Sequence, residues 1–292
     1  MNPAPFTYHK PASVAEAVAL LTQYDDEGAK LIAGGHSLLP VMKLRLAEPA
    51  HLIDLGGAGD DVLRAVTLDG DTLRVGALVT HRTLERDATI RRSAPLLAEM
   101  ARHVGDQQVR SRGTLGGTVA HADPAADYPA GLLVMDATVV AQGTDGTREI
   151  AIDAFFLGLL TTALSPDEII TEIRFPVAPA GTGVSYQKVA NQASGYAVVG
   201  VAAQVTRGAD GTATDVRVGV TGATDRAFRA SGVEAALAGK AIDDAGVTAA
   251  LDGVTDGIDF LEDISASATY RQRLVRGLVK RAVLEAASRA GA

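Results

Sequence analysis

The chain has 292 residues, with 27 Lys and Arg against 35 Asp and Glu, which gives a formal net charge of −8. This length predicts about two domains with buried cores. The excess of acidic residues disfavours nucleic-acid binding, which needs clustered cations. The absence of Cys excludes disulfides, a catalytic thiolate and a protein-ligated iron–sulfur cluster on this chain.

Targeting and membrane segments are not expected in this sequence. Residues 1–11 lack the apolar core of a signal peptide, and no run of about 18 apolar residues follows. We therefore expect a cytoplasmic protein.

The first elements surround a Gly-Gly pair. Ser13 and Glu16 have the spacing of a capping box, and apolar residues at helical spacing then predict a helix to about Tyr24. The expected order that follows is strand, Gly-Gly turn, helix and strand, over residues 30–33, 34–35, 38–46 and 50–55.

Later segments predict hairpins and longer strands. Alternating apolar residues flank three Asp-Gly turns, at Asp69–Gly70, Asp145–Gly146 and Asp210–Gly211. Leu96, Leu97, Met100 and Val104 indicate a helix between the first two. Further strands are expected over residues 169–175, 184–189, 197–206 and 214–221, and a final helix over 268–287.

The stretch from residue 176 to 183 is rich in Pro, Gly and Ala, and we expect a domain boundary there. The pattern as a whole predicts an α+β protein, with mixed sheets and helices on one side.

The first candidate site is the segment Ala33–Ser37 between a strand and a helix. Glycines at positions 34 and 35 allow a left-handed turn and a close ligand approach, and free amides at a helix start favour a phosphate or pyrophosphate. Ser37 would cap the helix or add a hydroxyl contact. The alternative is an ordinary glycine turn with a Ser cap.

The second candidate site is the segment Thr114–Thr118, another glycine pair expected to supply backbone donors. Asp123 and Asp127 follow it. These carboxylates would bind a cation, accept hydrogen bonds from sugar hydroxyls, or cap the helix expected near Tyr128.

Several familiar sites are absent from the sequence. It has no P-loop, no G-x-G-x-x-G fingerprint and no G-x-S-x-G elbow. The six His residues lack H-E-x-x-H spacing, so no metal centre is expected. The chemistry is therefore expected to belong to an organic cofactor.

Both glycine segments together resemble the FAD-binding medium subunit of molybdenum hydroxylases, a group with aerobic carbon monoxide dehydrogenase and relatives of xanthine dehydrogenase. The resemblance covers essentially the whole chain. It is carried by residues 33–46 (AGGHSLLPVMKLRL), 114–124 (TLGGTVAHADP), 155–156, 165–168, 186–188 and 191–197.

This resemblance implies a fold. Residues 1–176 would form a two-lobed FAD-binding domain of the vanillyl-alcohol-oxidase type, with lobes of about 1–56 and 57–176. Residues 177–292 would form a smaller α+β C-terminal domain of the carbon monoxide dehydrogenase flavoprotein type.

The same resemblance implies which residues bind FAD. The pyrophosphate would lie between the lobes, against the amides of both glycine segments, and Asp123 would contact polar groups of FAD. Leu164, Lys188 and Tyr196 would lie near the flavin ring. The full set is Ala33, Gly34, Gly35, His36, Ser37, Thr114, Leu115, Gly116, Gly117, Thr118, Asp123, Leu164, Lys188 and Tyr196.

Without the resemblance, Leu164 would be assigned to the core, Lys188 to a surface strand and Tyr196 to a loop. Two positions depart from the family pattern. Asn191-Gln192 replaces a frequent Asn-Pro, and Thr118 replaces a frequent Asn, which removes a side-chain amide.

The implied function is electron transfer. A large subunit with molybdopterin would oxidise the substrate, and a small subunit with two [2Fe-2S] clusters would pass electrons to FAD on this chain. The final acceptor would be a quinone, NAD+ or another oxidant. A dimer of heterotrimers is expected, in the cytoplasm or held by its partners at the inner face of the membrane.

Two other functions remain open from the residues. One is a self-sufficient flavin-dependent oxidase acting on a small organic substrate, and the other is a non-catalytic assembly module that has lost FAD. Intact glycine segments argue against the second.

Overall fold

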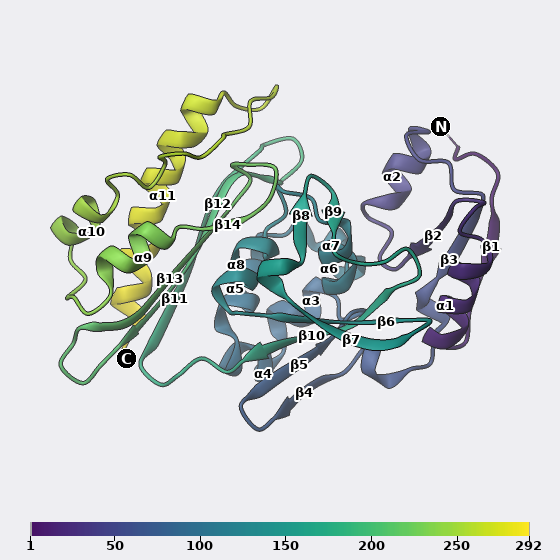
Figure 1. Cartoon of the computed structure of the whole chain (residues 1–292), viewed down its shortest axis with the longest axis horizontal. Helices are drawn as coiled ribbons and strands as arrows, with labels where there is room; N and C mark the ends of the chain where they lie inside the picture. Colours follow the sequence, from purple (N-terminus) through teal and green to yellow (C-terminus); the bar gives the residue numbers. More distant parts are fainter. Residues whose placement is uncertain (1, 292) are drawn as a thin grey trace.

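The computed structural model describes residues 2–291 and shows three successive parts of the chain side by side. In Figure 1 the N-terminal part lies at the right, a five-stranded sheet with its helices at the centre, and the C-terminal part at the left. The loop of residues 33–37 in the first part and the loop after β5 (Thr72–Gly76) in the second border the same cavity.

The N-terminal part is a small parallel sheet with the strand order β1-β3-β2. Helix α1 packs on it through Val14, Val18 and Leu21, which are buried. Its elements are β1 (Thr7–His9), α1 (Val14–Gln23), β2 (Ala29–Ile32), α2 (Leu38–Lys43) and β3 (His51–Asp54).

The start of α1 corrects one detail of the predicted capping box. The Ser13 hydroxyl accepts a hydrogen bond from the Glu16 N–H at 3.2 Å, as expected. The Glu16 carboxylate instead accepts from the N–H of Ala12 at 2.7 Å, one residue earlier than the reciprocal pattern requires. The cap still satisfies two backbone donors.

The central part is an antiparallel sheet with the order β4-β5-β10-β6-β7, flanked by short helices. A separate hairpin, β8–β9, lies between β7 and β10 in the chain. The elements are β4 (Val66–Asp69), β5 (Thr72–Gly76), α3 (His81–Arg86), α4 (Ala88–Ser93), α5 (Pro95–His103), α6 (Gln107–Arg112), α7 (Leu115–His121), α8 (Tyr128–Val134), β6 (Thr138–Gly143), β7 (Gly146–Ala151), β8 (Phe156–Gly158), β9 (Thr161–Thr162) and β10 (Ile169–Pro176).

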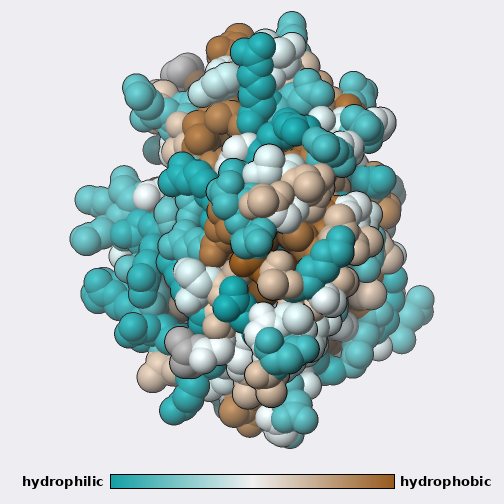
Figure 2. Space-filling view, turned by 90° about the vertical axis from the view of Figure 1, so that its left-hand side faces the viewer, coloured by the Kyte–Doolittle hydropathy of each residue, from teal (hydrophilic) through white to brown (hydrophobic). Residues whose placement is uncertain are grey.

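The C-terminal part is an antiparallel sheet with the order β11-β12-β13-β14 and a long final helix. Figure 2 shows this end of the molecule from outside, where apolar residues gather along the middle of the face. The elements are β11 (Thr182–Ala190), β12 (Ala197–Arg207), β13 (Ala213–Thr221), β14 (Phe228–Arg229), α9 (Ser231–Leu237), α10 (Asp244–Ala250) and α11 (Ala268–Arg289).

The α+β class and all three Asp-Gly hairpins are confirmed, but two features of the prediction are wrong. The three larger sheets are not mixed, because each is wholly parallel or wholly antiparallel. Helices also do not keep to one side. The sheet of β11–β14 lies between α11 on one face and α5 and α8 on the other. Residues 197–206 of β12 are accordingly all buried, which a one-sided sheet would not allow.

Two hydrophobic cores organise these parts. One joins α1, the central sheet and its helices, and it also includes Val184 and Tyr186 of β11. The other lies between the sheet of β11–β14 and helices α9, α10 and α11. The division of domains between residues 176 and 177 stays a prediction. Among residues 2–291, no helix combines the length and apolarity needed to span a membrane.

Candidate functional site

A cavity of about 730 Å³ lies between the N-terminal part, the central helices and the loop before β12. This volume falls within the range of about 300–1,000 Å³ common for cofactor and ligand sites. All the predicted FAD-binding residues line it except Leu115 and Lys188. The lining set from the prediction is Ala33, Gly34, Gly35, His36, Ser37, Thr114, Gly116, Gly117, Thr118, Asp123, Leu164 and Tyr196.

The loop of residues 33–37 presents free backbone donors to this cavity. Gly35 has a φ of +75°, a left-handed conformation that L side chains rarely adopt. Within residues 2–291, nothing accepts a hydrogen bond from the N–H groups of residues 34–37. Successive free amides of this kind form an anion-binding concavity. This loop is therefore suited to hold a phosphate or pyrophosphate.

Ser37 does not act as the predicted helix cap. It precedes α2, but its side chain makes no capping hydrogen bond, and its backbone is already in the helical region. Ser37 and Tyr196 both line the cavity, and the Ser37 hydroxyl opposes the rise in the pKa of the Tyr196 phenol.

The second glycine segment differs from the prediction, because its amides are already used. The N–H groups of Leu115 and Gly116 donate to the carbonyls of Val79 and Ala77, at 3.0 and 2.9 Å. Those of residues 117 and 118 donate to the hydroxyl and the carbonyl of Thr114, both at 3.1 Å. Gly116 and Gly117 therefore offer the cavity a close surface without side chains, and these amides are not free donors.

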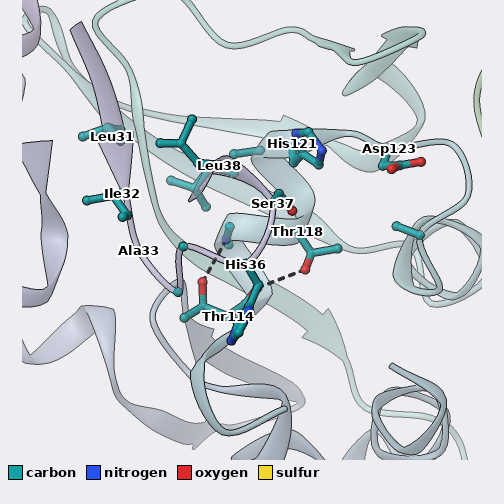
Figure 3. A pocket seen from close by; sticks show the side chains of 18 of the residues that line it. Leu31, Ile32, Ala33, His36, Ser37, Leu38, Thr114, Thr118, His121 and Asp123 are labelled. Atoms are coloured by element: carbon teal, nitrogen blue, oxygen red, sulfur yellow. Dashed lines mark hydrogen bonds between the residues drawn. The ribbon is translucent and has the colours of Figure 1, made fainter. Parts of the chain in front are cut away.

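The two glycine loops touch each other directly. A Cβ added at Gly34 would lie 2.3 Å from the Arg112 carbonyl oxygen and 2.7 Å from the Gly113 Cα. In Figure 3, His36, Thr114 and Thr118 lie close together, while Asp123 lies at the far side of the cavity. A side chain at residue 34 would push the two parts of the chain apart as well as narrow the cavity.

Asp123 combines two of the roles considered for it. Its Oδ1 accepts the Ala125 N–H at 2.8 Å, which makes it a turn residue. It also lines the cavity, so its second oxygen is available to a ligand. Asp127, in contrast, precedes α8 without capping it.

Asp127 forms a buried network with Lys188. The Lys188 Nζ lies 2.8 Å from Asp127 Oδ1, and the Tyr186 hydroxyl donates to the same carboxylate at 2.7 Å. The Lys188 ammonium also donates to the carbonyl of His103 at 3.0 Å. Burial raises the pKa of Asp127, and the Lys188 charge opposes that rise. Asp127 lines the cavity and Lys188 does not. Lys188 can therefore act on a ligand in the cavity only through its ion pair with Asp127.

His81 is a lining residue that the sequence analysis did not select. It is buried on α3, and its Nδ1 lies 3.0 Å from the Tyr128 hydroxyl. Burial, with smaller contributions from His36 and Arg110, lowers the pKa of His81 to about 4. The ring is therefore neutral at pH 7.

The remaining predicted residues lie at the far end of the cavity. Leu164 is half-buried and packs against the first core, and Tyr196 is 39% exposed. Burial, and secondarily the Asp123 charge, raises the pKa of the Tyr196 phenol. Leu160 and Ser194 also line this end, and neither was among the predicted site residues, although Ser194 lies within the segment 191–197 that carries the resemblance.

Comparisons with known proteins match the whole length of this arrangement. Residues 4–178 match the family described as the FAD binding domain in molybdopterin dehydrogenase. Residues 184–286 match the CO dehydrogenase flavoprotein C-terminal domain. The chain belongs to this family of FAD-binding medium subunits.

Individual relatives of this medium subunit cover nearly all of it. The carbon monoxide dehydrogenase medium chain of Hydrogenophaga pseudoflava is 40% identical, over 97% of both chains. The nicotine 6-hydroxylase medium subunit of Paenarthrobacter nicotinovorans is 38% identical, also over 97% of both. A solved structure of the Hydrogenophaga pseudoflava enzyme superposes with a TM-score of 0.95 at 41% identity, covering 100% of both chains. The predicted family, oxidoreductase class and FAD-binding fold are thereby confirmed.

The buried His81 predicts a loss of stability in acid. Between pH 6.5 and about 4 the unfolded chain binds a proton at His81 that the folded chain does not, so stability falls as the pH falls. The lowered pKa of His81 corresponds to a loss of unfolding free energy on the order of 3 kcal/mol over this pH range. Urea denaturation at pH 7.0 and 4.5 should show a smaller pH effect for His81→Gln than for the unaltered chain. An equal pH effect in both would contradict a neutral buried His81.

The Asp127 network predicts strong coupling between its charges. Lys188→Met leaves a buried carboxylate without its partner, which should cost about 3–5 kcal/mol of unfolding free energy. Adding Asp127→Asn should restore most of that loss, because the uncompensated charge is removed. A double-mutant cycle by chemical denaturation measures both effects. Additive losses would show that the two side chains act independently.

Proposed function

We propose that this medium subunit transfers electrons from [2Fe-2S] clusters of a partner chain to an external acceptor. The observation that supports this proposal is the cavity itself. Free amides of residues 34–37 border it on one side, and Gly116 and Gly117, which have no side chains, border it on the other. The chain has no Cys to ligate a cluster, so the clusters have to belong to another subunit. A large subunit with molybdopterin, a small subunit with the clusters and a dimer of heterotrimers complete this proposal.

The residues of the chain fit the cofactor. The loop of residues 33–37 would hold the pyrophosphate through its amides, while Gly116 and Gly117 would allow close approach. Leu164 and Tyr196 would border the flavin ring at the other end. When bound, FAD accepts electrons singly or in pairs. The protein positions it, and the neutral His81 and paired Asp127 limit the charge beside it.

The test of this function is purification of the tagged chain from its native host. We expect about one FAD per chain, two copurifying partner chains, and molybdenum and iron in the complex. Carbon monoxide and nicotine, which the names of the two relatives indicate, then serve as probe substrates, and the visible absorbance of the flavin reports its reduction. A colourless chain that takes up no FAD would contradict the proposal. Reduction of the isolated chain by one of these compounds would favour a self-sufficient oxidase.

The cavity predicts a specific effect of filling it. Thr118 is half-buried and lines the cavity, so Thr118→Phe should occupy space that the cofactor needs. We expect its FAD dissociation constant to rise by about tenfold or more, as steric exclusion at a packed site costs a few kcal/mol. Fluorescence titration of the apoprotein with FAD measures this.

Thr118→Val is the matched control for this prediction. It keeps the volume and removes a hydroxyl that donates to the Thr114 carbonyl at 3.2 Å, so FAD affinity should change only a few-fold. Equal FAD affinity in the Phe and Val variants would mean that Thr118 does not border the cofactor. Gly34→Val would disturb the contact with the Arg112 carbonyl as well as the cavity, so it would not isolate an effect on FAD.

A further inference from the structure

Four consecutive short helices, α3 to α6, carry a concentration of arginine on a chain that is acidic overall. Residues 81–112 contain seven Arg, four acidic residues and no Lys, whereas the whole chain has a net charge of −8. Helix α3 packs against α4, α5 and α6, which groups these residues on one layer of helices in the central part of the molecule (Figure 1). Six of the arginines are exposed, and we call them the arginine face: Arg82, Arg86, Arg91, Arg92, Arg102 and Arg112.

The acidic residues of the same segment do not neutralise the arginine face. Glu85 pairs with Arg110 at 3.3 Å, and Glu99 pairs with Arg289 at 2.9 Å. The other two carboxylates accept backbone N–H groups as the N-caps of α4 and α6. Among residues 2–291, no carboxylate forms an ion pair with any arginine of the face. Six positive charges are therefore left without partners on one surface.

Stabilisation of helix ends accounts for only part of this pattern. Arg86 and Arg102 lie in the last turns of α3 and α5, where the helix dipole favours a cation. Arg82 lies in the first turn of α3, where the dipole disfavours a cation, and it stands four residues before Arg86, a like-charge spacing that destabilises a helix. Arg91 and Arg92 are adjacent in the last turn of α4, so they repel each other. The arginine face therefore carries more positive charge than the fold needs.

The composition of the arginine face favours a protein partner over a lipid surface. Arginine is enriched and lysine is depleted in protein interfaces, and residues 81–112 contain no Lys. Peripheral binding to a membrane combines basic residues with apolar side chains that insert between the lipids. None of the exposed large hydrophobic residues of the described chain lies between residues 69 and 156. Charge complementarity then selects an acidic protein.

The arginine face borders the cofactor cavity. Arg112 directly precedes Gly113, which lines the cavity. Arg102 lies two residues before Val104, and Val104 and Gly105 line the cavity as well. A protein bound to the face would therefore dock beside the cofactor. Small interfaces of this kind are typical of the weak encounters through which redox proteins exchange electrons.

We propose that the arginine face docks an acidic one-electron carrier protein, which takes electrons from the cofactor. This inference rests on the proposed function and specifies its external acceptor. In each encounter one carrier molecule accepts one electron, and its redox centre is reduced. Two carriers in turn remove both electrons of the reduced cofactor, and its two protons pass to water.

The test compares two forms of one carrier. Succinylation of cytochrome c replaces its lysine ammonium groups by carboxylates, so the modified protein is acidic and the native protein is basic, with the same haem. The FAD-loaded complex is reduced chemically without oxygen, and the haem absorbance reports electron transfer. At low salt we expect the acidic form to be reduced faster than the basic form by about tenfold or more. In about 0.5 M salt, screening should shrink the difference to a few-fold.

Two matched pairs of variants locate the effect on the surface. Arg82→Glu combined with Arg91→Glu reverses two charges of the arginine face, and neither residue lines the cavity. A glutamate in the first turn of α3 also suits the helix dipole. Arg273→Glu combined with Arg281→Glu makes the same change of net charge on α11, where both arginines are exposed.

The two pairs should differ in rate and in binding. The Arg82 and Arg91 pair should slow reduction of the acidic carrier at low salt by about tenfold or more, and the α11 pair should change it by less than about twofold. Isothermal titration of the oxidised complex with succinylated cytochrome c, which needs no turnover, should show the same contrast in the dissociation constant. Arg82→Gln combined with Arg91→Gln should give a smaller loss in the same direction, and it serves if the Glu variant does not fold.

Several outcomes would overturn the inference. Equal effects of the two variant pairs, no preference for the acidic carrier, or rates that do not depend on salt would each do so. Loss of the copurifying chains from the Arg82 and Arg91 variant would make the face a permanent subunit interface instead. Binding of the complex to anionic lipid vesicles that this variant loses, with unchanged carrier reduction, would assign the face to a membrane.

Failure of the proposed function has a different signature, because the unaltered chain would then retain no FAD or copurify with no partner. A complex that keeps FAD and its partners but shows no preference for the acidic carrier contradicts only the docking of that carrier.

Discussion

The site depends on one backbone contact between segments about eighty residues apart. Gly34 lies so close to the Arg112 carbonyl and the Gly113 Cα that no side chain fits between them. This contact joins the N-terminal part to the central helices. Among residues 2–291 the amides of residues 34–37 have no hydrogen-bond acceptor, and the cavity that they border takes its lining from both parts.

The two glycine segments look alike in the sequence, but their backbone amides differ in whether they are free to bind a ligand. The first has unused amides and supplies donors to an anion. In the second, the amides of residues 115–118 already donate to Thr114, Ala77 and Val79, so Gly116 and Gly117 offer the cavity a surface without side chains. The first segment is suited to bind the charged group, and the second allows a ligand to come close to the backbone. An extended dinucleotide needs both, because its linkage is charged and its rings are broad.

The sequence predicted those features that local chemistry determines. The Asp-Gly turns placed three hairpins, and nearly all of the residues predicted from the glycine segments and the family resemblance line the cavity. Features set by tertiary contacts were not visible. The amide of Leu115 is satisfied by a carbonyl 36 positions earlier, and Lys188 meets an aspartate 61 residues before it. Ser37 stands directly before α2, yet its side chain makes no capping hydrogen bond.

The ion pair between Lys188 of β11 and Asp127, which directly precedes α8, has a consequence for how such chains evolve. Asp127 lines the cavity and precedes residue 176, whereas both groups that neutralise and hydrogen-bond it, Lys188 and Tyr186, lie after residue 176. If the N-terminal segment were combined with a C-terminal sheet that lacks Lys188 and Tyr186, the buried carboxylate of Asp127 would have no partner. The two segments are thus constrained to be inherited together, and recombination among relatives should succeed only where this electrostatic match travels with the exchanged piece.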